Sequence, residues 1–146
     1  MQQYSLVVAL RFWHPTIDPS SITEQLGISP MHFNVVGQPR FTPKGTPLEG
    51  TYKESYWHAE PIRQGWCESA ISVAEDTLRE LLPQLLPHRH YIQHIADSGG
   101  RAMIHISTQS SSNYAIVLSP ELMAEYSNLG LSIAHEVYSS SFSRQS

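Results

Sequence analysis

Residues 4–27 read YSLVVALRFWHPTIDPSSITEQLG, and this stretch decides the fold. Its first ten residues, 4–13, are apolar and β-prone at most positions on both faces, which predicts a central strand. Asp18 then suits a helix N-cap, Pro19 suits the first helical position, and Gly27 suits the left-handed residue after the last turn. The stretch therefore predicts a buried strand followed closely by a short, well-capped helix.

Downstream of this stretch, alternating and amphipathic segments predict the remaining elements. Ser72 to Glu75 matches a capping box at the start of a leucine-rich helix, and Pro83 either kinks or ends that helix. The predicted strands lie at 31–35, 52–59, 91–95, 102–108, 114–118 and 131–138, the predicted helices near 72–85 and 119–130, and a long Pro-rich loop at 37–50.

The order of these elements predicts an α+β fold. The first six run βαββαβ, which is the order of a split βαβ, ferredoxin-like unit, and a C-terminal ββαβ extension follows. We therefore expect two layers, a mainly antiparallel sheet with helices on one face. Residues 1–138 are predicted to form a single domain, and the polar residues 139–146 a disordered tail.

Scarce fixed charge is the most unusual property of the composition. Only 15% of the 146 residues are charged, against a typical value of about 25%. Eight His accompany 9 Lys and Arg and 13 Asp and Glu, and the net charge is -4 with His neutral. This balance argues against nucleic acid as a partner. The single Cys, together with the lack of a signal-like or membrane-spanning segment, predicts a cytoplasmic protein that contacts no membrane.

Several short segments carry a family likeness. They are residues 17–30, 37–39, Trp57, the leucine-rich helix at 78–86, then 97–100, 113–114, 118–122, 129–131 and 137–138. In this order and spacing the chain resembles the bacterial domain-of-unknown-function family 4279, almost from end to end. The resemblance implies a single bacterial domain and transfers no activity, ligand or site residue. The stretch 135–138, HEVY, departs from the family, in which we expect acidic residues before the Tyr.

A cluster of histidines suggests one candidate site. If residues 90–95 form a strand, His90 and His94 share a face, and His105 on a neighbouring strand can join them. Imidazole suits Zn, Cu or Ni, so these three residues support a metal-binding protein or a metal-dependent hydrolase. Against this, a same-face pair lies about 7 Å apart along a strand. No carboxylate completes a known metal motif. Partly exposed polar histidines are the alternative interpretation.

The loop at 37–50 is either a Pro-stiffened surface loop or a functional segment, and as a functional segment it favours protein contact over phosphate binding. Loops this long are uncommon inside a domain and are often functional. Gly37, Arg40 and Lys44 lie in it, and Trp57 belongs to an aromatic set that forms either part of the core or a buried partner surface. Cys67 is a further candidate, as a thiol placed before a helix. No catalytic signature is present, so we expect a non-enzymatic binding or interaction module that needs no cofactor. Its partner is a protein or a second copy of the chain, and an immunity or antitoxin-like role fits.

The many histidines predict a pH-dependent solubility. Imidazoles titrate between about pH 5.5 and 7, where protonation of about four of them cancels the net charge. We expect solubility and oligomeric state to change within that window, as measured by sedimentation and light scattering at several concentrations. A flat profile across the window contradicts this prediction.

Overall fold

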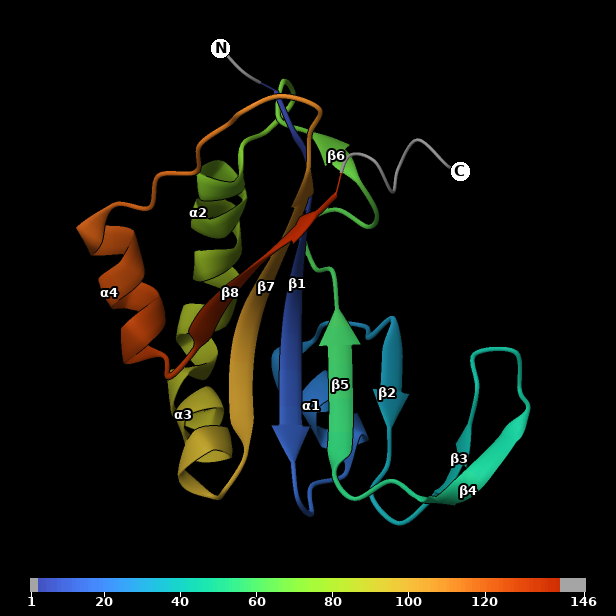
Figure 1. The fold of residues 1–146 in the computed structure, drawn as a ribbon. Helices are drawn as coiled ribbons and strands as arrows, with labels where there is room; N and C mark the ends of the chain where they lie inside the picture. Colours follow the sequence, from blue (N-terminus) through green and yellow to red (C-terminus); the bar gives the residue numbers. More distant parts are fainter. Residues whose placement is uncertain (1–2, 140–146) are drawn as a thin grey trace.

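The computed structural model describes residues 3–139 and places a sheet in front of its helices (Figure 1). The strands of the main sheet are β1 (Ser5–His14), β2 (His32–Asn34), β5 (Ser55–Ala59), β6 (Cys67–Glu68), β7 (Arg101–Gln109) and β8 (Ser132–Tyr138). The helices are α1 (Pro19–Leu26), α2 (Ala74–Leu85), α3 (Arg89–Asp97) and α4 (Pro120–Asn128), with a 3-10 turn at Leu86–His88. A separate hairpin consists of β3 (Pro39–Phe41) and β4 (Pro47–Thr51).

The predicted first strand is the centre of the sheet. The strand order is β2-β5-β1-β7-β8, and β6 also pairs with β1. Only β7 and β8 pair in parallel; the other pairs are antiparallel. The predicted α+β class with a mostly antiparallel sheet is therefore confirmed.

Alternation along β1, interrupted only by the buried Ala9, divides the sheet into two faces. Leu6, Leu10 and Phe12 are at most 2% exposed and pack beneath the helices. The intervening residues, among them Arg11 and Trp13, point to the opposite face, which no helix covers (Figure 1). Burial of one face stabilises the fold, and the other face remains available for a ligand or a partner.

The helix α1 forms as its sequence predicts. The Asp18 side chain accepts a hydrogen bond from the Ser20 backbone N–H at 3.0 Å, and Pro19 occupies the first helical position. Gly27 ends the helix with a φ of 67°, in the left-handed region. These three residues set both ends of α1, and this prediction is confirmed.

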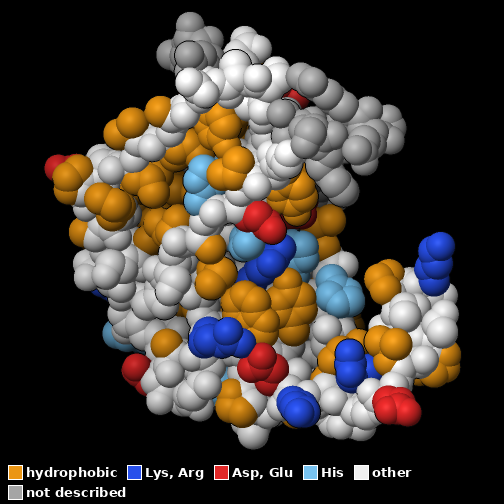
Figure 2. Space-filling model, viewed as in Figure 1, with side chains coloured by type: hydrophobic (Ala, Val, Ile, Leu, Met, Phe, Trp, Pro, Cys, Tyr) orange, Lys and Arg blue, Asp and Glu red, His pale blue; other side chains and the backbone are white. Residues whose placement is uncertain are grey.

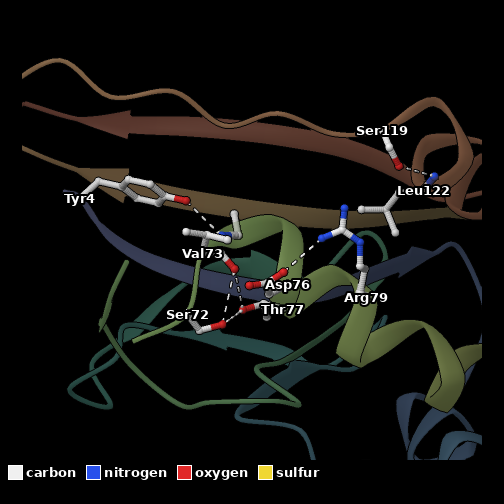
Figure 3. Close-up of polar contacts among 9 residues, drawn as sticks. Tyr4, Ser72, Val73, Asp76, Thr77, Arg79, Ser119 and Leu122 are labelled. Atoms are coloured by element: carbon white, nitrogen blue, oxygen red, sulfur yellow. Dashed lines mark hydrogen bonds and ion pairs between the residues drawn. The ribbon is translucent and has the colours of Figure 1, made fainter. Parts of the chain in front are cut away.

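The start of α2 differs from the predicted capping box. Val73 occupies the N-cap position without a side-chain hydrogen bond. The Ala74 backbone N–H instead donates to the Tyr4 hydroxyl at 3.0 Å (Figure 3). Ser72 lies one residue too early to cap, and its hydroxyl contacts that of Thr77. The hydroxyl of Tyr4, the residue just before β1, thus replaces the local cap, and it connects α2 to the sheet.

Pro83 does not end α2. It lies inside the helix, which continues to Leu85 before the 3-10 turn and α3. By contrast, Ser119 caps α4 as the sequence suggests, accepting from the Leu122 N–H at 3.1 Å (Figure 3).

Three predicted elements are wrong. Residues 91–95 belong to α3 and not to a strand, and their buried residues Ile92 and Ile95 lie three apart, as on one helical face. Residues 114–118 form no strand, although Tyr114 packs against the core. The segment 37–50 contains β3 and β4 and is not simply a loop.

These corrections change the C-terminal part of the fold. The extension after the helices is β7-α4-β8, so the predicted ββαβ order is wrong. The ferredoxin-like description of the start remains a prediction. The predicted tail at 139–146 lies, beyond Ser139, outside the described residues. Between residues 3 and 139, no helix is long and apolar enough to cross a membrane.

The Tyr4 contact predicts a stability change. We expect Tyr4→Phe to lower the free energy of unfolding by about 1–3 kcal/mol, because it leaves the buried Ala74 N–H without an acceptor. Urea unfolding measures the difference. Tyr91→Phe is the matched control, since its hydroxyl makes only a longer 3.3 Å contact with Ser21. Equal losses in the two variants contradict the capping role.

Candidate functional site

The helix-free face of the sheet carries a group of polar and aromatic side chains. Figure 2 shows basic, acidic and histidine side chains close together among hydrophobic ones in the middle of this face. Arg11 of β1 lies in register between His58 of β5 and Met103 of β7. The alternation of three adjacent strands therefore places a cation at the centre of the open face.

The carboxylates near this centre already have cationic or imidazole partners. Glu60 Oε2 lies 3.6 Å from His58 Nε2, and Glu136 Oε1 lies 3.0 Å from His105 Nε2. Glu54 accepts a hydrogen bond from Arg101 at 2.9 Å. In addition, the Arg101 guanidinium lies 4.7 Å from the centre of the Trp13 ring.

Arg11 differs from these groups because it lacks a counter-ion. Its guanidinium makes no ion pair within 4 Å with any carboxylate of residues 3–139. Its Nε is buried and has no hydrogen-bond acceptor in this part of the chain. Buried polar groups normally find a partner, so this unpaired donor marks the centre of the face as a candidate binding site.

Two cavities share Arg11 as a wall. One has a volume of about 510 Å³ and is lined by Arg11, Trp13, Asn34, Tyr52, Lys53, Glu54 and Tyr56. The other, of about 210 Å³, is lined by Val7, Ala9, Arg11, His58, Glu60, Gly65, Trp66, Ser107 and Tyr138. Together they offer cationic groups and aromatic rings to a bound molecule on either side of the guanidinium.

The pKa of His58 is lowered from its ordinary value. Burial is the largest cause, and the positive charge of Arg11 is the next. Glu60 acts in the opposite direction, while His32 and His105 lower the pKa further. His58 is therefore held in its neutral form around neutral pH, and Arg11 supplies the positive charge of the site.

The sequence did contain a signal for this site. Arg11 is the one charged residue in the apolar stretch 4–13. A charge in a strand with two covered faces is costly, so its presence indicates that one face is open. His58 gives no comparable signal, since its position beside Arg11 follows from the β1–β5 register.

The predicted contact residues of the loop lie on an exposed arm. Gly37, Arg40 and Lys44 belong to the β3–β4 hairpin segment, which projects from the sheet beyond β2 (Figure 1). Arg40 Nη1 donates to the Glu49 carbonyl at 3.3 Å. A cleft of about 830 Å³ separates this arm from β2, lined by His32, Phe33, Asn34, Val35, Gln38, Pro39, Phe41, Thr42, Pro43 and Tyr52.

Trp57 does not belong to that surface. It is 0% exposed, and its Nε1 donates to Thr23 Oγ1 at 3.0 Å beneath α1. The register explains this, because Trp57 pairs with the buried Phe12 while Tyr56 and His58 face the other way. Of the two interpretations of Trp57, the core position therefore agrees with the structure and the partner contact is corrected.

The three histidines of the predicted metal site are not brought together. His90 and His94 lie on the exposed surface of α3, so the assumed strand is wrong. His105 lies on the helix-free face of the sheet, beside Glu136. Within residues 3–139, no group of three or more His, Cys, Asp or Glu side chains is placed to hold a metal ion.

Cys67 is not at a helix start. It lies in β6, half-buried, seven residues before the first residue of α2, and its thiol contacts the Glu68 carbonyl at 3.6 Å. The field of the α2 N-terminus therefore does not act directly on this thiol.

The lowered pKa of His58 predicts a pH dependence of stability. The unfolded chain binds a proton at His58 more tightly than the folded chain does, so stability rises with pH in this range. The contribution of neutral His58 to stability is fully present above its pKa in the unfolded chain, about 6.5. It is lost as the pH falls through the lower pKa of His58 in the folded chain. The free energy of unfolding of wild type, measured with urea, should therefore decrease from about pH 7.5 to about pH 5.

His58→Gln should reduce this slope, because Gln does not titrate. His90→Gln, an exposed histidine on α3, is the matched control and should keep the wild-type slope. An unchanged slope in His58→Gln contradicts the assignment.

Comparison with known proteins gives one relationship. Neither the curated proteins nor the solved structures give a match to this chain. The family described as Domain of unknown function (DUF4279) matches residues 2–140, which is nearly the whole chain. All the elements of the chain from β1 to β8, including the arm and the face that carries Arg11, fall inside the matched region. The chain therefore belongs to the DUF4279 family.

Proposed function

We propose that this chain is a non-enzymatic binding module for a protein partner, and that the β3–β4 arm and its cleft are the contact surface. The observation that carries this proposal is the arm itself, a hairpin whose β3 and β4 residues are all exposed. An isolated two-stranded hairpin is at best marginally stable in water, so a partner that covers the arm stabilises it. Such a module needs no cofactor.

Apolar side chains lie in the cleft and on the arm. Phe33 on β2 is 54% exposed and Phe41 on β3 is 50% exposed, and both line the cleft. Leu48 on β4 is 43% exposed on the arm. Exposed aromatic and aliphatic side chains around a cleft are typical of protein contact sites. Because β2 is the edge strand of the sheet, an extended segment of the partner can lie along it, between β2 and the arm.

The charge of the arm indicates which partner segment fits. Arg40 and Lys44 are cationic and Glu49 is the one carboxylate between residues 37 and 50, so the arm is positive although the chain has a net charge of -4. Charge complementarity therefore favours an extended segment that carries Asp or Glu. An immunity or antitoxin-like role, in which the chain occupies a functional surface of its partner in the cytoplasm, is one form of this proposal.

Site-specific photo-crosslinking in the native cells tests the proposal. A photoreactive phenylalanine replaces Phe41 in one variant and Phe33 in another. Ile71 and Val117, which are 75% and 69% exposed away from the arm, provide the matched control positions. We expect one protein to be crosslinked from both arm positions and from neither control position.

A second measurement uses the crosslinked protein after its identification. Phe41→Ser should weaken its binding at least about tenfold in a titration with purified proteins, whereas Ile71→Ser should not. Equal crosslinking at the control positions, or undiminished binding by Phe41→Ser, overturns the proposal. If the arm crosslinks to a second copy of this chain, the partner is that copy and the contact surface is a homodimer interface.

A further inference from the structure

Arg11, on the helix-free face of the sheet, is a cation without a counter-ion among residues 3–139. Arg11 is half-buried, and its Nε has no hydrogen-bond acceptor within residues 3–139. The carboxylates nearby are engaged elsewhere: Glu54 by Arg101, Glu136 by His105, and Glu60 by the Gly65 backbone N–H, which donates to it at 2.6 Å. A partly desolvated guanidinium without a carboxylate is unfavourable, and an anion that binds beside it removes that cost.

The space beside Arg11 has the size of a small-molecule site. The larger of its two cavities, at about 510 Å³, falls within the range of roughly 300–1,000 Å³ that such sites occupy. Lys53 lines the same cavity and adds a second cation, while Tyr52 and Tyr56 provide aromatic surface. This hollow is shallow and open to solvent, so its volume, and not its enclosure, is what suits a small ligand.

The neighbouring charges decide which anion fits. Glu54 lines the larger cavity and Glu60 the smaller one, so both recesses beside Arg11 contain a carboxylate. A doubly charged phosphate group would be repelled by these residues more strongly than a singly charged carboxylate. The planar guanidinium can bind either group through two parallel hydrogen bonds, so it is the charge of the neighbouring glutamates that favours the carboxylate.

We propose that Arg11 binds the carboxylate of a small organic acid, whose apolar or aromatic body lies in the cavity beside Tyr52 and Tyr56. This site adjoins the arm cleft, because Asn34 and Tyr52 line both, but Arg11, Lys53 and Tyr56 do not line that cleft. The inference therefore goes beyond the proposed function. The inference rests on the missing counter-ion of Arg11, on the volume of the larger cavity, and on Arg11 and Lys53, the two cationic groups that line it. It concerns binding alone and involves no covalent step.

Titration with aromatic acids, followed by nuclear magnetic resonance, tests this site. The probes are phenylacetate and benzoate, with phenylacetamide as a neutral analogue and inorganic phosphate as a competing anion. We expect each acid to shift the Arg11 Nε–Hε resonance in a saturable way within the millimolar range. The amide and phosphate should produce no such shift. The arm variant Phe41→Ser should bind the acids as wild type does, which separates this site from the proposed function.

Two variants complete the experiment. Arg11→Gln should reduce the affinity for phenylacetate at least tenfold, followed through the Tyr56 and His58 resonances, while Arg79→Gln on α2 should leave it unchanged. A preserved spectrum of the buried core residues shows that Arg11→Gln is folded. As an independent measure, bound phenylacetate should raise the pKa of His58 in wild type, because it offsets the positive charge of Arg11.

Three results overturn the inference. The first is the absence of any saturable shift with either acid. The second is binding of phosphate or of the neutral amide as strongly as the acids. The third is an affinity for phenylacetate that Arg11→Gln leaves unchanged. If neither acid binds but capture of a protein partner depends on Arg11, the face is a protein contact and the small-molecule site is wrong.

Discussion

The pairing of β1 with three other strands is the interaction on which the rest of the structure depends. β1 pairs with β5 along one edge, with β6 farther along that side, and with β7 along nearly its whole length. Its alternate residues form the floor of the helical core on one face and the Arg11 group on the other. A single ten-residue strand thus fixes both the hydrophobic packing and the position of the open face.

The two candidate surfaces differ in how the fold supports them. Arg11 and His58 project from adjacent strands in the middle of the sheet, where the register holds them in place. The arm, in contrast, forms a two-stranded sheet of its own, bordered by turns and fully exposed along β3 and β4. Rigid strands suit recognition of a small group with a defined geometry, whereas a protruding hairpin suits contact with a larger partner.

Local chemistry explains which parts of the fold can be predicted from the sequence. The ends of α1 follow from Asp18, Pro19 and Gly27, since each acts through its own backbone conformation or a nearby hydrogen bond. The start of α2 depends on Tyr4, which is distant in sequence, so no local pattern reveals it. The segment 91–95 is β-prone by composition, yet packing of Ile92 and Ile95 against the core favours a helix. Arg11 could be singled out from its strand, but its missing counter-ion depends on the positions of three distant glutamates.

The position of β1 also has a consequence for the order of folding. This strand is synthesised well before its longest partner, β7, which begins only at Arg101. The pairing of Val8 with Ile106 therefore waits until all the residues between them have been synthesised. Contacts so distant in sequence slow folding, and the apolar β1 remains with an unpaired edge in the meantime. Arg11, in the middle of that strand, then acts during synthesis as a charged interruption that opposes association with other nascent chains.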